Sequence, residues 1–195
     1  MAPKSLAELY VEELQDLYSA EKQILDALPK MIEAATNAEL KHGFETHRRQ
    51  TEGHVSRLEE IFKELDEDAD GDKCKGMEGI IKEGSDLIKE KPEPAVLDAG
   101  LIAAAQHVEH YEMAGYGSVK SWARRLGHEY QARLLEETLK EEKETDALLT
   151  ETAEQSVKQD AEAGANRAAA LGDRATEARE TGGRGTAADV PELRL

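Results

Sequence analysis

Four long stretches of the chain carry apolar residues at helical spacing, and polar residues interrupt each stretch near its middle. Apolar side chains recur every three or four residues over about residues 5–35, 37–65, 94–126 and 128–158. This spacing is typical of one buried helix face. A shorter helical pattern, "MEGIIKEGSDLIKE", occupies residues 77–90. The pattern predicts an all-α protein with four long helices and one short helix.

The ends of the first two helices have recognisable signals. Ser5 followed by Glu8 matches a capping box at the start of the first helix. Pro29 is expected to kink or end that helix, because proline removes a backbone donor. Either Thr36 or Asn37 is expected to cap the second helix.

The lengths of the connections predict the topology. The first and second long helices are joined by a tight turn, and so are the third and fourth. Roughly 30 residues, including the short helix, separate the second from the third. Two antiparallel hairpins joined by a long crossover are typical of the ferritin-like four-helix bundle, which we therefore expect here.

A change in composition predicts the domain boundary. Residues 159–195 contain mainly alanine, glycine and charged residues, with almost no large apolar side chain. We expect a bundle domain over residues 1–158 and a flexible tail, disordered or weakly helical, over residues 159–195.

The polar interruptions are the candidate functional residues. Burying a carboxylate is costly unless a positive charge neutralises it. Here all four long helices carry polar residues at matching depth, and three of the helices carry carboxylates there. A solvated surface position is the usual explanation for any one of them. The whole set favours a site for two Fe or Mn ions, with zinc less selective. The predicted ligands are Glu21, His47, Gln50, His54, Glu109, Glu112, Glu142 and Asp146.

Two further features were weighed against this site. Glu141, the neighbour of Glu142, is expected to be solvated. The acidic loop places Asp66, Asp68 and Asp70 as a calcium-binding EF-hand loop would, but Met77 occupies the position of its bidentate glutamate. A solvated acidic turn is the better interpretation of that loop.

Bulk composition excludes several classes. The formal net charge of −17 disfavours nucleic acid and anionic membranes as partners. A single cysteine, Cys74, excludes an internal disulfide and a cysteine-rich metal module. The sequence has no recognisable signal peptide and no apolar run long enough for a membrane span, so a cytoplasmic protein is expected.

Three segments resemble the YciF-type bacterial ferritin-like proteins, which are associated with stress responses. These segments are "YSAEKQIL", "LIAAAQHVEHYEMAGYG" and "LLEETLKEEKETDALLT". The resemblance implies a dimeric ferritin-like bundle with a rubrerythrin-like arrangement of metal ligands. This chain has Gln50 where such proteins tend to have glutamate, and His54 where they tend to have glutamine.

Two functional hypotheses follow. The first is a dinuclear iron or manganese protein that acts on peroxide or O₂. The second is a non-enzymatic helical oligomer, or a metal buffer without turnover. In both cases a homodimer or higher homo-oligomer is expected. Whether the protein is an enzyme is left open at this point, since no substrate pocket or nucleophile motif is recognisable.

Overall fold

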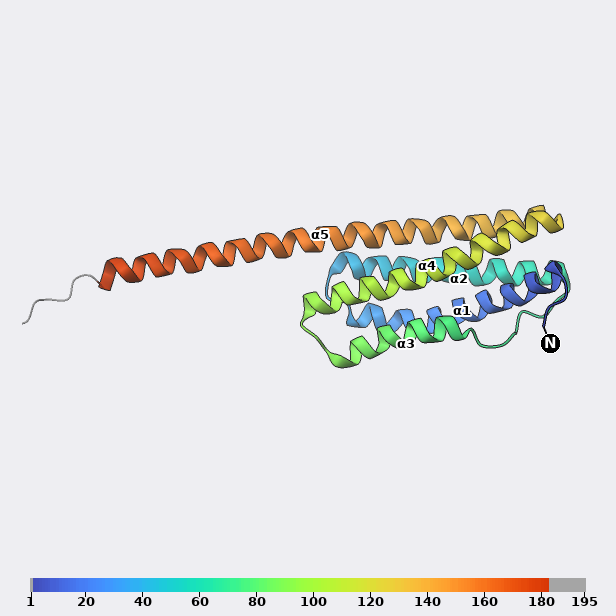
Figure 1. The fold of residues 1–195 in the computed structure, drawn as a ribbon, viewed down its shortest axis with the longest axis horizontal. Helices are drawn as coiled ribbons and strands as arrows, with labels where there is room; N and C mark the ends of the chain where they lie inside the picture. Colours follow the sequence, from blue (N-terminus) through green and yellow to red (C-terminus); the bar gives the residue numbers. More distant parts are fainter. Residues whose placement is uncertain (1, 183–195) are drawn as a thin grey trace, which may run out of the picture. The chain divides into compact units, whose positions relative to one another are not determined.

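The structure, a computed structural model, is built from helices alone over its described part (Figure 1). It describes the backbone of residues 2–182 and the side chains of residues 2–155, and no strand occurs among them. The all-α prediction is confirmed. None of the described helices is long and apolar enough to cross a membrane. The helices are α1 (Leu6–Ala34), α2 (Ala38–Leu65), α3 (Lys75–Glu90), α4 (Pro94–Leu126) and α5 (Glu129–Gly182).

The predicted signals at the first helix ends have different outcomes. The Ser5 side chain accepts a hydrogen bond from the Glu8 backbone N–H, so the predicted cap of α1 is confirmed. Asn37, not Thr36, caps α2 by accepting from two backbone N–H groups. Pro29 does not end α1, which continues to Ala34. Buried residues on both sides of the proline hold the last turns against the core.

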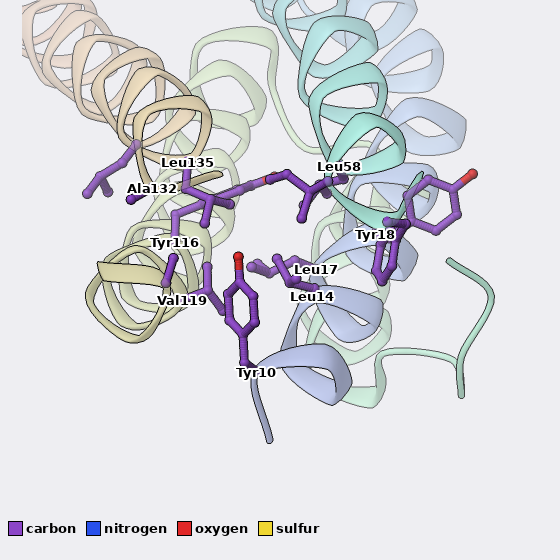
Figure 2. Close-up of a cluster of buried hydrophobic side chains, with 13 residues drawn as sticks. Tyr10, Leu14, Leu17, Tyr18, Leu58, Tyr116, Val119, Ala132 and Leu135 are labelled. Carbon is purple, nitrogen blue, oxygen red and sulfur yellow. The ribbon is translucent and has the colours of Figure 1, made fainter. Parts of the chain in front are cut away.

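Two apolar clusters fill the interior. Figure 2 shows the first, in which side chains from α1, α2, α4 and α5 meet. Its members include Tyr10, Leu14, Leu17, Leu58, Tyr116, Val119, Leu135 and Leu139. The second cluster includes Ile24, Leu28, Leu40, Phe44, Met77, Leu101, Ile102 and Leu149. On each long helix, the candidate ligands lie between the residues of one cluster and those of the other.

The order of the clusters along each helix gives the helix directions. Helices α1 and α5 run from the first cluster to the second, whereas α2 and α4 run from the second to the first. Because α2 and α4 run the same way, a short turn cannot join them. The connection contains α3, which contacts both α1 and α4 (Figure 1).

The C-terminal part of the chain forms a separate unit. Two compact units are distinguished, one ending at Glu154 and the other beginning at Gln155. The backbone of α5 is helical as far as Gly182, and residues 183–195 lie outside the described residues. The flexibility of the tail over residues 159–195 stays a prediction.

A buried aspartate on α4 holds the turn between α1 and α2. Asp98 is 6% exposed, and its carboxylate accepts three hydrogen bonds. The donors are the Thr36 backbone N–H at 2.8 Å, the Thr36 hydroxyl at 2.5 Å and the Asn37 backbone N–H at 2.9 Å. These bonds satisfy backbone donors that the turn would otherwise leave unpaired.

We expect Asp98→Ala to lower the free energy of unfolding by about 2 kcal/mol, because it leaves these partly buried donors without their charged acceptor. Urea unfolding followed by circular dichroism measures the change. Asp86→Ala on α3 is the control, since the Asp86 side chain is 46% exposed and forms ion pairs with the exposed Lys82 and Lys89. Equal unfolding midpoints for the two variants would contradict the role assigned to Asp98.

Candidate metal centre

Six of the eight predicted ligands come together in the interior between the two apolar clusters. Each long helix contributes at least one of them, and none is more than 3% exposed. The sequence explains their burial, because each replaces an apolar residue on the buried face of its helix. They are Glu21 on α1, His47 and His54 on α2, Glu109 and Glu112 on α4, and Glu142 on α5.

These side chains form two overlapping groups that share Glu142. One group comprises His47, Glu109, Glu112 and Glu142, and the other comprises Glu21, His54 and Glu142. Within each group the potential ligand atoms lie within 4.8 Å of one another. Oxygen and imidazole donors at this spacing are of the type that binds Fe, Mn or Zn.

Individual distances show how closely the groups are packed. His54 Nδ1 lies 2.9 Å from Glu142 Oε1 and 3.3 Å from Glu21 Oε1. His47 Nε2 lies 3.4 Å from Glu109 Oε1. The shared carboxylate of Glu142 also approaches His47, with Oε2 at 4.0 Å from Nδ1. One residue of α5 thus faces both histidines of α2.

Many polar atoms of the cluster have no hydrogen bond of good geometry, although His54 Nδ1 and Glu142 Oε1 lie within ion-pair distance. Such orphaned buried atoms are rare in folded proteins, since each loses its hydration without compensation. A cation between them would supply the missing interaction, so the donor set fits a metal pair. Among the described residues these atoms are Glu21 Oε2, His47 Nε2, His54 Nδ1, Glu109 Oε2 and both carboxylate oxygens of Glu112 and Glu142.

Burial and mutual repulsion change the protonation of the metal-free cluster. Burial raises the pKa of Glu109 and Glu112 well above the usual carboxyl range, and the neighbouring carboxylates raise it further. Burial alone would lower the pKa of His54, but Glu21 and Glu142 raise it to about 10. Burial also opposes ionisation of Glu142, yet His54 keeps the pKa of Glu142 below its usual value. At neutral pH, protons therefore neutralise much of this charge.

A second layer of contacts orients the cluster. His54 Nε2 lies 3.0 Å from Glu141 Oε2, and the Arg57 guanidinium donates to both Glu141 oxygens, at 2.6 and 3.1 Å. The Tyr116 hydroxyl donates to Glu21 Oε1. A carboxylate on the outer nitrogen of a ligand histidine fixes its ring orientation and its tautomer.

Sequence reasoning missed this layer. The expectation that Glu141 is solvated is wrong, because Glu141 is half-buried and paired with both His54 and Arg57. The contact of the Tyr116 hydroxyl with Glu21 was not predicted either. A signal existed for both partners, since Arg57 follows His54 by one helical turn and Tyr116 follows Glu112 by one turn.

The other two predicted ligands, Gln50 and Asp146, are less deeply buried than these six. Gln50 is half-buried, and the fully buried residue between His47 and His54 is Thr51. Asp146 is 23% exposed and lies near His110, 3.3 Å away, and Gln106, 3.2 Å away. Asp146 belongs to neither of the two groups of carboxylate and imidazole atoms, whereas Gln50 lines a cavity together with His47 and Glu109 and stays a predicted ligand.

The acidic loop between α2 and α3 does not resemble a calcium site. Within the described residues, no group of three or more potential ligands includes a residue of this loop. The position of the expected bidentate glutamate is filled by Met77, which is fully buried in the second apolar cluster. The interpretation as an acidic turn agrees with this arrangement.

Comparisons with known proteins identify relatives along most of the chain. A family model described as a domain of unknown function, DUF892, matches residues 5–162. Protein YciF of Escherichia coli (strain K12) is 41% identical over 163 residues, which are 83% of this chain and 98% of that protein. The predicted resemblance to YciF-type proteins is confirmed by these matches.

Solved structures show the same likeness. The crystal structure of the E. coli stress protein YciF matches 80% of this chain and 99% of its own, with a TM-score of 0.78 and 41% identity. YcfI of Rhodopseudomonas palustris, suggested to be a structural protein, matches 75% of this chain and 94% of its own, with a TM-score of 0.73 and 41% identity. A protein from Xanthomonas campestris shares the fold at 21% identity, over 81% of this chain and 97% of its own, with a TM-score of 0.63.

We expect the metal-free protein to lose stability as pH rises above about 4.3, the usual unfolded value for glutamate. The folded chain retains protons on Glu109 and Glu112 that the unfolded chain releases, so raising the pH favours unfolding. Each retained proton contributes a slope of about 1.4 kcal/mol per pH unit.

The measurement is urea unfolding of chelator-treated protein across this range of pH. Glu112→Gln should flatten the decline, because an amide mimics the neutral carboxyl at every pH. Glu144→Gln is the matched control, since Glu144 is an exposed residue of α5. If Glu112→Gln and Glu144→Gln both kept the wild-type slope, the assignment of the retained protons would be wrong.

Proposed function

We propose that this chain, which belongs to the DUF892 family, is a ferritin-like protein that holds two metal ions in its buried cluster. The order of its helices supports the ferritin-like topology, in which two antiparallel hairpins are joined by a long crossover. In that fold, carboxylates and histidines from four helices project inward to form a dinuclear site.

The observation that carries this proposal is the set of buried, unpartnered donor atoms contributed by four helices. A site of this kind without a cation leaves several carboxylate oxygens dehydrated and unpaired, which is costly for a purely structural core. Two positive ions would remove that cost at once. Iron and manganese are the favoured metals, and zinc is a less selective alternative.

The two groups of residues assign ligands to each ion. Glu21 and His54 would hold one ion, and His47, Glu109 and Glu112 would hold the other, with Glu142 between them. A redox-active metal pair bound there would supply the electrons for reducing peroxide or O₂.

The chain's own residues have definable roles in this function. His54 would give up one proton on loading and use Nε2–H to donate to Glu141, which Arg57 holds in place. Glu109 and Glu112 would release their protons on loading as well. The two apolar clusters pack on either side of the site.

The likeness to YciF supports a biological setting for this proposal. YciF of E. coli is described as a stress protein, and a role in a stress response is proposed for this chain by that likeness. A homodimer or higher oligomer is part of the same proposal. The second candidate is a structural or metal-buffering role without turnover, which the description suggested for YcfI favours.

Metal content tests the ligand assignment. We expect about two Fe or Mn ions per chain after reconstitution, because the two groups each complete one site. Glu21→Ala should lose about one ion, whereas Glu142→Ala should lose both, since Glu142 belongs to both groups.

Elemental analysis of tag-free protein measures this stoichiometry, with circular dichroism as the check on folding. Glu144→Ala, on the exposed face of the same helix as Glu142, is the control and should keep two ions. Unchanged metal content in folded Glu142→Ala would contradict the assignment.

Peroxide consumption tests the function itself. We expect reduced, metal-loaded protein to be oxidised by roughly one equivalent of peroxide per metal pair, since a two-electron reduction matches two one-electron ions. Turnover beyond that needs an outside reductant. Stopped-flow absorbance after mixing with hydrogen peroxide measures the rate, beside Glu109→Ala.

The comparison with free metal decides between the two candidates. If wild-type protein, Glu109→Ala and free metal were oxidised at the same rate, the protein would be a binder or scaffold. Faster oxidation of the wild type alone supports the enzyme.

A further inference from the structure

A cavity of about 150 Å³ lies beside the candidate metal centre and is lined by all five helices. Its walls are mainly apolar and belong to or pack against the second apolar cluster. The wall residues include Ile24, Leu28, Phe44, Ile80, Ile88 and Leu149. An apolar cavity of about this size accommodates a molecule as large as benzene.

One end of the cavity is polar. His47, Gln50 and Glu109 line it together, and two of their buried atoms, His47 Nε2 and Glu109 Oε2, have no hydrogen-bond partner in the described residues. His47 is 3% exposed and Glu109 is 1% exposed. This end therefore offers hydrogen-bonding groups to a molecule whose other atoms contact only apolar walls.

Some of the other lining residues lie at the protein surface. Lys30, Glu39 and Glu144 are exposed and charged, and they line the same cavity. A charged rim disfavours a broad apolar face of a second copy of the chain as the occupant. The net charge of −17 disfavours an anionic ligand such as a fatty acid.

We propose that this cavity binds a small neutral alcohol or phenol, with its apolar body between the cluster residues and its hydroxyl at His47, Gln50 and Glu109. Gln50 lines the cavity together with His47 and Glu109 and is thereby assigned to recognition of the hydroxyl. Binding of the body does not require metal. His47 and Glu109 belong both to the candidate metal centre and to the cavity lining. A reaction between the bound alcohol or phenol and the metal centre would therefore rest on the proposed function.

The probe for this proposal is 4-methylphenol, compared with toluene, which has the same ring and methyl group without the hydroxyl. Ligand-observed NMR titration of metal-free protein measures both affinities. We expect 4-methylphenol to bind with a dissociation constant below about 1 mM and toluene to bind roughly 3–10-fold more weakly, which is the effect of one hydrogen bond.

A filled cavity should remove the binding. Ala27 is a half-buried cavity residue of α1, whereas Ala7 is exposed on the same helix and lies outside the cavity. Ala27→Leu should weaken binding of 4-methylphenol at least about tenfold, because the added atoms occupy the space of the ring. The matched control Ala7→Leu should keep the wild-type affinity. Ser85→Leu repeats the test from α3 if Ala27→Leu does not fold.

The outcomes separate this proposal from the proposed function. Failure of 4-methylphenol to bind, or equal affinity for Ala27→Leu and Ala7→Leu, overturns the binding site. Equal affinity for toluene overturns the recognition of the hydroxyl. An affinity that falls as protein concentration rises would assign the cavity to a second copy and overturn the proposal. If the protein bound 4-methylphenol but took up no metal, the ligand-binding cavity would be supported and the proposed metal-dependent function would be contradicted.

Discussion

The burial of four carboxylates and two imidazoles at one level of the bundle is the constraint on which the rest of this structure depends. These groups are almost completely buried, so their charge must be neutralised by protons or by cations. In the metal-free chain, part of that neutralisation comes from His54, which lies between Glu21 and Glu142. A cluster that is only partly satisfied in this way is suited to exchange protons for metal ions.

This polar level also fixes how the helices align. Each long helix places its polar residues between two apolar clusters, so a shift of one turn, about 5.4 Å, would bury a carboxylate among aliphatic side chains.

Close packing between α1 and α4 contributes to the same alignment. At Gly115 on α4, an added Cβ would lie 2.7 Å from a Leu17 side-chain atom of α1. The two helices therefore approach closely beside the site.

Much of this arrangement could be predicted, and the positions that helical periodicity leaves undecided have a common physical cause. Helical periodicity identifies His47 and His54, which lie two turns apart on one line, but it does not choose between Gln50 and Thr51. With a rotation of 100° per residue around the helix axis, Gln50 lies about 50° to one side of the line through His47 and His54, and Thr51 lies about 50° to the other side. Tertiary packing buries Thr51 and leaves Gln50 at the cavity. The same ambiguity applies to Thr145 and Asp146, which lie between Glu142 and Leu149.

The two sides of the candidate centre differ in a way that sequence periodicity cannot reveal. On the Glu21 and His54 side, the Tyr116 hydroxyl and the Glu141–Arg57 pair occupy the surrounding positions. On the His47 and Glu109 side, the apolar cavity adjoins the site instead. Such asymmetry depends on contacts between helices far apart in the chain. It suits one side to holding ligands in place and the other to admitting a small molecule.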